Sequence, residues 1–136
     1  MKTNKRKNIV DTYNTIYSVD IVVAKNADYK YLNKYYMYTD GCDLESSIND
    51  GVASVTLCTR RSDNKNVIII TWNSDTPRYK IDNKKAYMIN TMAHEATHAA
   101  VDTWYILDEN VDIRHQEPFA YFVGWVAECI YRTISK

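Results

Sequence analysis

The stretch Met92-Ala93-His94-Glu95-Ala96-Thr97-His98-Ala99-Ala100 decides how the rest of the chain is interpreted, because it sets an H-E-x-x-H motif among strong helix formers. Residues four apart share one face of an α-helix, so His94 and His98 can offer two imidazole nitrogens to one metal ion. Glu95 then projects beside that face, where zinc chemistry needs a carboxylate that accepts a proton without being a ligand. The motif predicts a zinc site; an ordinary helical pair of histidines is the alternative.

The helix that carries the motif is predicted to run from about Lys84 to Tyr105, because neither Gly nor Pro occurs between residues 84 and 110. Two stripes follow from its period. The stripe expected to face the core comprises Ile89, Met92, Ala96, Ala99 and Thr103. The adjoining polar stripe comprises Thr91, His94, Glu95, His98 and Asp102. Asp102, one turn past His98, is a candidate to accept a hydrogen bond from that imidazole, or is an ordinary exposed aspartate.

A catalytic zinc site needs a third protein ligand. The extension H-E-x-x-H-x-x-G-x-x-H is absent, since Val101 and Trp104 stand where Gly and His would be needed. Glu117 is the best candidate: it lies 19 residues beyond His98, at the start of a helix predicted over 117–132. His115, in the connection before that helix, is the alternative ligand.

A group that stabilises the developing oxyanion is also expected near the metal. Tyr121, one turn past Glu117, is the preferred candidate for this catalytic role, and His115 is the other. Pro118 fits the first turn of the final helix. The apolar residues expected to bury one side of that helix are Phe119, Phe122, Val123, Val126 and Ile130.

Upstream of the motif the sequence predicts a small, mostly antiparallel sheet. Residues 15–24, 52–60 and 66–72 are rich in β-branched and aromatic residues, and the last two form a hairpin. Residues 27–38 predict an amphipathic helix, and residues 73–83 a loop. Either hairpin strand could hold an extended peptide substrate by edge pairing, or simply fill the sheet. The expected fold is α+β, with the sheet packed on the N-terminal helix and two C-terminal helices that carry the metal.

Composition narrows the class of protein. The 136 residues predict a single domain over 1–136, with residues 1–8 as a flexible basic arm. Lysine plus arginine and aspartate plus glutamate number 17 each, so the zero net charge argues against a nucleic-acid or membrane binder. No signal peptide or membrane span is visible, and three cysteines without a C-x-x-C pair indicate reduced thiols. These features predict synthesis in the cytoplasm without export by a signal peptide, and they leave any later location open.

The motif followed by Glu117 resembles the gluzincin arrangement of zinc metallopeptidases. The string His-Glu-Ala-Thr-His-Ala-Ala at 94–100, with Gln-Glu-Pro-Phe-Ala-Tyr at 116–121, is similar to small metallopeptidases encoded by tailed bacteriophages. The resemblance covers roughly the last third of the chain. It implies a zincin-like fold and a Zn²⁺-dependent endopeptidase acting on a peptide or protein. It also implies His94, His98 and Glu117 as ligands and Glu95 as general base.

Two departures from that family lead to a second hypothesis. Tyr121 stands where larger gluzincins carry an Asp that orients a histidine, and the chain lacks room for their separate substrate-binding subdomain. The alternative function is therefore a phage virion or assembly component that keeps the fold, and its metal, without turnover, in contact with other virion proteins. A third hypothesis is a nucleic-acid binder that uses the basic arm and the Lys and Tyr residues of 27–38.

Overall fold

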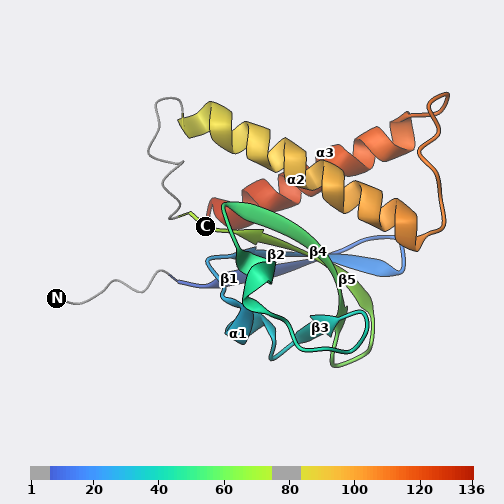
Figure 1. The fold of residues 1–136 in the computed structure, drawn as a ribbon. Coiled ribbons are helices and arrows are strands. Elements are labelled where there is room, and N and C mark those ends of the chain that lie inside the picture. Colours follow the sequence, from blue (N-terminus) through green and yellow to red (C-terminus); the bar gives the residue numbers. More distant parts are fainter. Residues whose placement is uncertain (1–6, 75–83) are drawn as a thin grey trace.

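The computed structural model describes residues 7–74 and 84–136 and shows an α+β architecture (Figure 1). Five strands form one sheet in the order β1-β2-β5-β4-β3. Three of the four neighbouring pairs are antiparallel, and β2 with β5 is the parallel pair. The expected fold class and the mostly antiparallel sheet are therefore confirmed.

The centre of the sheet is formed by β2 (Val19–Lys25) and β5 (Asn66–Trp72), whose residues are almost all buried. Alternate side chains point to opposite faces, so Ile21 and Ile68 pack against the long helices while Val22 and Ile69 pack on the other side. Such unbroken apolar runs are typical of strands covered on both faces.

The predicted hairpin is confirmed as β4 (Ala53–Arg60) and β5, joined by the polar turn 61–65. The predicted strand over 15–24 begins too early, because β2 starts at Val19. β1 (Ile9–Asn14) pairs with β2 across a turn at 15–18, where the Thr15 hydroxyl donates to the Val19 carbonyl at 2.6 Å. Residues 9–14 are half-exposed and mixed in polarity, as an edge strand permits, so their pattern is weak. Of the predicted arm over 1–8, residues 1–6 lie outside the described residues.

The helix predicted over 27–38 is also corrected. Only α1 (Tyr29–Leu32) is helical, with the Asp28 carboxylate capping it through the Tyr31 amide at 2.8 Å. The chain then forms β3 (Tyr36–Tyr38), which pairs with residues 58–60 of β4. Pairing with a neighbouring strand outweighs a modest helical pattern that is rich in β-prone tyrosines. Together α1, the 3₁₀ turn Ser46–Asn49 and the adjacent loops cover one face of the sheet.

The other face is covered by α2 (Lys84–Ile106) and α3 (Glu117–Ile134), which contact each other and cross in the view of Figure 1. Both predicted C-terminal helices are confirmed. On α3 the apolar stripe is buried or half-buried as expected. On α2 the stripe is rotated: Thr91 and Glu95 are buried, whereas Ile89 is 59% exposed. The predicted loop 73–83 lies largely outside the described residues.

Among the described residues, one edge of β4 has no strand partner over most of its length. The Arg60 amide donates to Lys65 in the turn toward β5, and the Arg61 amide donates to Tyr35 on the β3 side. Backbone groups alternate in direction along an antiparallel strand, so those of Ala53, Val55 and Leu57 point away from β5. β3 reaches only residues 58–60, and no other described strand pairs there.

The three cysteines are free, as predicted. Within residues 7–74 and 84–136, no helix has both the length and the apolar character needed to cross a membrane.

Candidate metal centre

The two motif histidines converge on the exposed face of α2. Their Nε2 atoms lie 3.1 Å apart, with ring centroids at 4.7 Å. Two nitrogens bound to one tetrahedral zinc ion at about 2.0–2.1 Å would be about 3.3 Å apart. The pair therefore already has close to the separation that chelation requires. The same distance also allows one imidazole to donate a hydrogen bond to the other.

Glu95 lies on the side of α2 that turns toward the sheet, and it is 8% exposed. Burial raises the pKa of its carboxyl above the ordinary value, while the neighbouring His94 and His98 act in the opposite direction. A carboxyl that is largely withdrawn from water beside two imidazoles is suited to accept and return a proton. The buried position of Glu95 differs from the polar stripe that the sequence predicted.

A depression of about 300 Å³ lies between α2 and the start of β4, and both His94 and Glu95 line it. Tyr87, Asn90 and Thr91 line the same depression from the preceding turns of α2. Thr91 belongs to the predicted polar stripe, whereas Tyr87 and Asn90 are missing from the site that the sequence predicted. They stand seven and four positions before His94, so helical spacing alone could have found them.

Asp102 follows His98 by one turn and is half-buried. Burial raises the pKa of its carboxyl, and the nearby His98 partly offsets that rise. The position is compatible with support of His98, although the two side chains form no hydrogen bond among those described. The suggested partnership stays a prediction.

Glu117 and Tyr121 lie on the outer face of α3, both exposed, with Tyr121 at 75%. They line a shallow depression together with Gly124, Trp125 and Glu128, a surface to which no residue of α2 contributes. Within the described part of the chain, no three His, Cys, Asp or Glu side chains gather closely enough to hold a metal ion. The predicted set of His94, His98 and Glu117 is therefore not assembled in this structure.

His115 lies in the connection between α2 and α3, where its Nδ1 is 3.0 Å from the Asp112 carboxylate. It lines a pocket at the C-terminal end of α2 rather than the depression beside His94. Its predicted roles as third ligand or oxyanion donor find no support in this placement.

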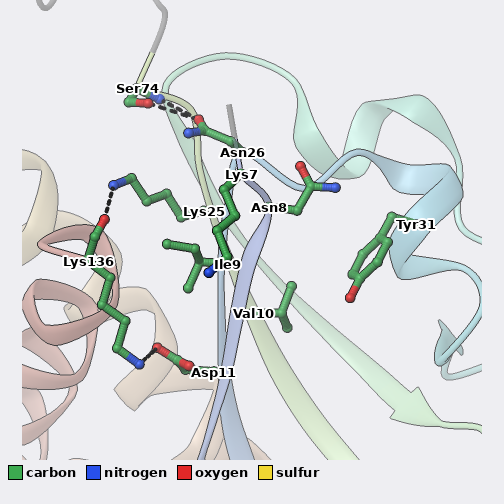
Figure 2. Close-up of a pocket in the computed structure, with 10 residues that line it drawn as sticks. All are labelled: Lys7, Asn8, Ile9, Val10, Asp11, Lys25, Asn26, Tyr31, Ser74 and Lys136. Carbon is green, nitrogen blue, oxygen red and sulfur yellow. Dashed lines mark hydrogen bonds and ion pairs between the residues drawn. The ribbon is translucent and has the colours of Figure 1, made fainter. Parts of the chain in front are cut away.

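A larger depression, of about 760 Å³, lies elsewhere, between β1 and the end of the chain (Figure 2). Two of its lysines are already engaged: the Lys25 ammonium donates to the Ile134 carbonyl at 2.8 Å, and that of Lys136 contacts Asp11 at 2.7 Å. None of the predicted site residues lines it. We therefore take the histidine face of α2 as the candidate site.

The residues present fit a zinc ion in part. Two imidazoles of the right separation, with a buried carboxyl beside them, supply two ligands and a base. The third ligand is the element that the arrangement lacks.

No protein-family model, no curated protein and no solved structure matches this chain.

Proposed function

We propose that the chain is a zinc-dependent peptidase in which His94 and His98 bind the metal and Glu95 is the general base. The observation that carries the proposal is the convergence of the two Nε2 atoms at 3.1 Å, directly beside the buried carboxyl of Glu95. Zinc, when bound, supplies positive charge that polarises water and the scissile carbonyl. The fold class is compatible with a minimal zincin-like domain, which remains part of the proposal.

Glu95 performs the proton transfers in this proposal. Its raised pKa brings the carboxyl closer to neutral pH, where a base both accepts and returns a proton efficiently. Glu95 takes the proton from the attacking water and then passes it to the leaving amine, which departs as the peptide bond breaks. The net reaction adds one water across one amide bond.

The free edge of β4 suggests how a peptide substrate is held. Ala53 lies at the depression that contains His94 and Glu95, and the outward backbone groups of Val55 and Leu57 continue from it along the strand. An extended peptide paired with this edge would lie next to the histidine face. The substrate class that fits is a polypeptide segment in extended form.

The third ligand in the proposal is Glu117, which the gluzincin resemblance assigns. In this structure Glu117 begins α3, after the ten-residue connection 107–116 that contains no helix or strand. A three-ligand site requires the first turn of α3 to approach the histidines of α2. Substitution of Glu117 is therefore the sharpest test of whether the site has the three ligands that catalysis needs.

The decisive experiment compares wild type with Glu95→Gln, using zinc-loaded protein and a mixture of unstructured peptides. We expect Glu95→Gln to retain zinc and to lose about 10²- to 10⁴-fold in kcat, because only the base is removed. Glu128→Gln is the matched control, since it makes the same change on the exposed face of α3. Undiminished hydrolysis by Glu95→Gln, or wild type that binds no zinc, would refute the proposal.

A competing function needs no complete catalytic site: a virion or assembly component that keeps the zincin-like fold for architecture, without turnover. Among the described residues, no group of three metal-ligating side chains gathers at the histidines. As such a component, the protein would act in the host cytoplasm or within the virion, in contact with other virion proteins. Glu95→Gln would then leave assembly intact, whereas His94→Ala would disrupt it. Wild type that binds zinc without hydrolysing any peptide would support this alternative.

A further inference from the structure

A second pocket, of about 520 Å³, lies at the C-terminal end of α2, where the connection 107–116 turns back toward α3. Three aromatic side chains, Tyr17, Trp104 and Phe119, form part of its wall, and Glu109 and Asp112 stand at it as well. A volume in this range is typical of small-ligand sites. Neither His94, Glu95 nor His98 lines it, so the pocket is separate from the candidate metal centre.

The aromatic wall is centred on Trp104. Tyr17 meets its ring edge-on at 5.9 Å and 73°, and Phe119 does so at 5.4 Å and 87°. Near-perpendicular contacts on two sides hold the indole in place. All three side chains are only half-buried, so part of their surface stays accessible. The faces of such rings carry partial negative charge and attract cations.

Glu109 is held beside Trp104 by the way α2 ends. The Glu109 amide donates to the Trp104 carbonyl at 2.9 Å, and the Asp108 amide donates to the Tyr105 carbonyl at 3.1 Å. Asp108 adopts a positive φ of 55°, which completes a Schellman-type termination without glycine. The backbone of Glu109 is therefore fixed relative to the indole before any ligand binds.

Asp112 is held as an ionised carboxylate. The hydrogen bond from the His115 ring, at 3.0 Å, and the one from the Arg114 amide, at 2.9 Å, lower the pKa of Asp112. Neither contact is a lysine or arginine side chain. The Asp112 side chain is 56% exposed, so its carboxylate stays accessible to a ligand beside the contact with His115.

The end of α2 adds to the negative potential. The last turn of this 23-residue helix carries no basic side chain, so no lysine or arginine offsets the partial negative charge of its terminal carbonyls. Among the described residues, those that line the pocket include no lysine or arginine either. Two carboxylates, the helix end and three aromatic rings therefore all favour a positively charged occupant.

We propose that this pocket binds an organic cation, a guanidinium or primary ammonium group on an aliphatic chain. The chain packs against Trp104 and the charged group lies against Glu109 and Asp112. A bare metal ion fits less well, because ring carbons are not metal ligands and the described residues contain no group of three metal-ligating side chains. The chemistry is that of an arginine or lysine side chain, or of a free amine. The proposal is independent of zinc and of peptidase activity.

The test is an NMR titration of the full chain that follows the indole N–H of Trp104. The probe is Nα-acetyl-L-arginine amide, and its neutral counterpart is Nα-acetyl-L-citrulline amide. We expect saturable shifts with a dissociation constant on the order of 1 mM for the arginine probe, and binding weaker by about tenfold or more for citrulline. Equal binding of the two probes, or no shift of Trp104 with either, would overturn the proposal.

Variants locate the site. Glu109→Gln and Asp112→Asn should each weaken binding of the arginine probe by about tenfold, because each removes one charged partner. Asp112→Asn also alters the contact with His115. Glu109→Gln leaves that contact in place, so it tests the loss of charge alone. Glu45→Gln, an exposed carboxylate elsewhere, is the matched control. Binding that is unchanged by Glu109→Gln would contradict the assignment.

Further probes separate the two sources of the cation. Preference for the blocked arginine amide over free L-arginine and spermidine would identify a residue within a polypeptide. Equal or stronger binding of the free amines would identify a small metabolite. Either result upholds a cation site.

Discussion

The histidine pair on α2 and the Glu117 and Tyr121 pair on α3 have the same spacing and opposite outcomes. Each pair stands four residues apart on a long helix, so each shares one helical face. The imidazoles of His94 and His98 converge at 3.1 Å, whereas Glu117 and Tyr121 lie on the outer face of α3. Helical spacing fixes what happens within one helix. It does not fix which face of the next helix turns toward it.

The largest expected effect tests the histidine pair within α2. His98→Ala should lower zinc affinity by about 100-fold or more, since even a partner that only supports a ligand is worth 10–100-fold. Equilibrium dialysis with zinc and a competing chelator measures the affinity. Thr97→Ala is the matched control, because Thr97 is exposed on the same turn and its hydroxyl contacts only the Ala93 carbonyl at 2.8 Å. Equal zinc affinity in the two variants would show that His98 is not a zinc ligand.

Glu117→Ala tests whether the first turn of α3 supplies a ligand to the metal. If α3 closes on the metal as proposed, zinc affinity should fall by about tenfold or more, because one ligand of three is lost. The same dialysis applies, with Glu128→Ala as control for an exposed glutamate that lines the same depression. Two variants that both match wild type would show that Glu117 is not a zinc ligand.

The sequence predicted those elements whose pattern comes from their own residues. α2 and α3 have long stretches with helical period, and the hairpin of β4 and β5 has β-prone runs around a polar turn. It missed β1, whose residues are mixed in polarity. It also misassigned residues 27–38, where β3 depends on pairing with a strand later in the chain. Tyr36, for example, pairs with Arg60. A contact of that kind leaves little trace in local periodicity.

The features of the candidate site also fall into those that local sequence predicts and those that depend on distant contacts. His94, Glu95 and His98 could be assigned from spacing, and the orientation of the imidazoles agrees with it. The burial of Glu95 could not, because it depends on how α2 is rotated over the sheet. The position of Glu117 depends on the path of residues 107–116, which no periodic pattern describes. The cation pocket at the end of α2 also depends on that path, and the sequence alone did not suggest it.

A smaller effect is expected from proline substitutions that remove amides on the two opposite edges of β4. Val55→Pro removes an amide that points to the free edge, whereas Thr56→Pro removes one that bonds to β5. We expect Val55→Pro to fold and to raise KM for peptides by about tenfold, the value of one backbone hydrogen bond to substrate. Thr56→Pro should destabilise the fold by about 3 kcal/mol. Thermal unfolding and peptide kinetics distinguish them, and an unchanged KM in Val55→Pro would exclude this edge as the substrate platform.

The smallest effect concerns the stability of the metal-free protein. Because the pKa of Glu95 is raised by burial, the folded state binds its proton more tightly than the unfolded state does. The resulting stabilisation is complete below the unfolded pKa of about 4.3 and is lost as pH rises through the higher folded value. Glu95→Gln should therefore raise Tm by a few degrees at pH 8 and by less at pH 4.

Asp63 provides the control of opposite sign for that measurement. The hydrogen bonds from Arg60, at 2.9 and 3.0 Å, lower the pKa of Asp63, so its stabilising contribution is present at neutral pH and is lost as pH falls. Asp63→Asn should therefore lower Tm at pH 8 and approach wild type at low pH. If Glu95→Gln instead followed the same course as Asp63→Asn, then Glu95 would be stabilised by partners rather than strained by burial. The helix face that carries it would then be a salt-bridged surface and not a site prepared for proton transfer.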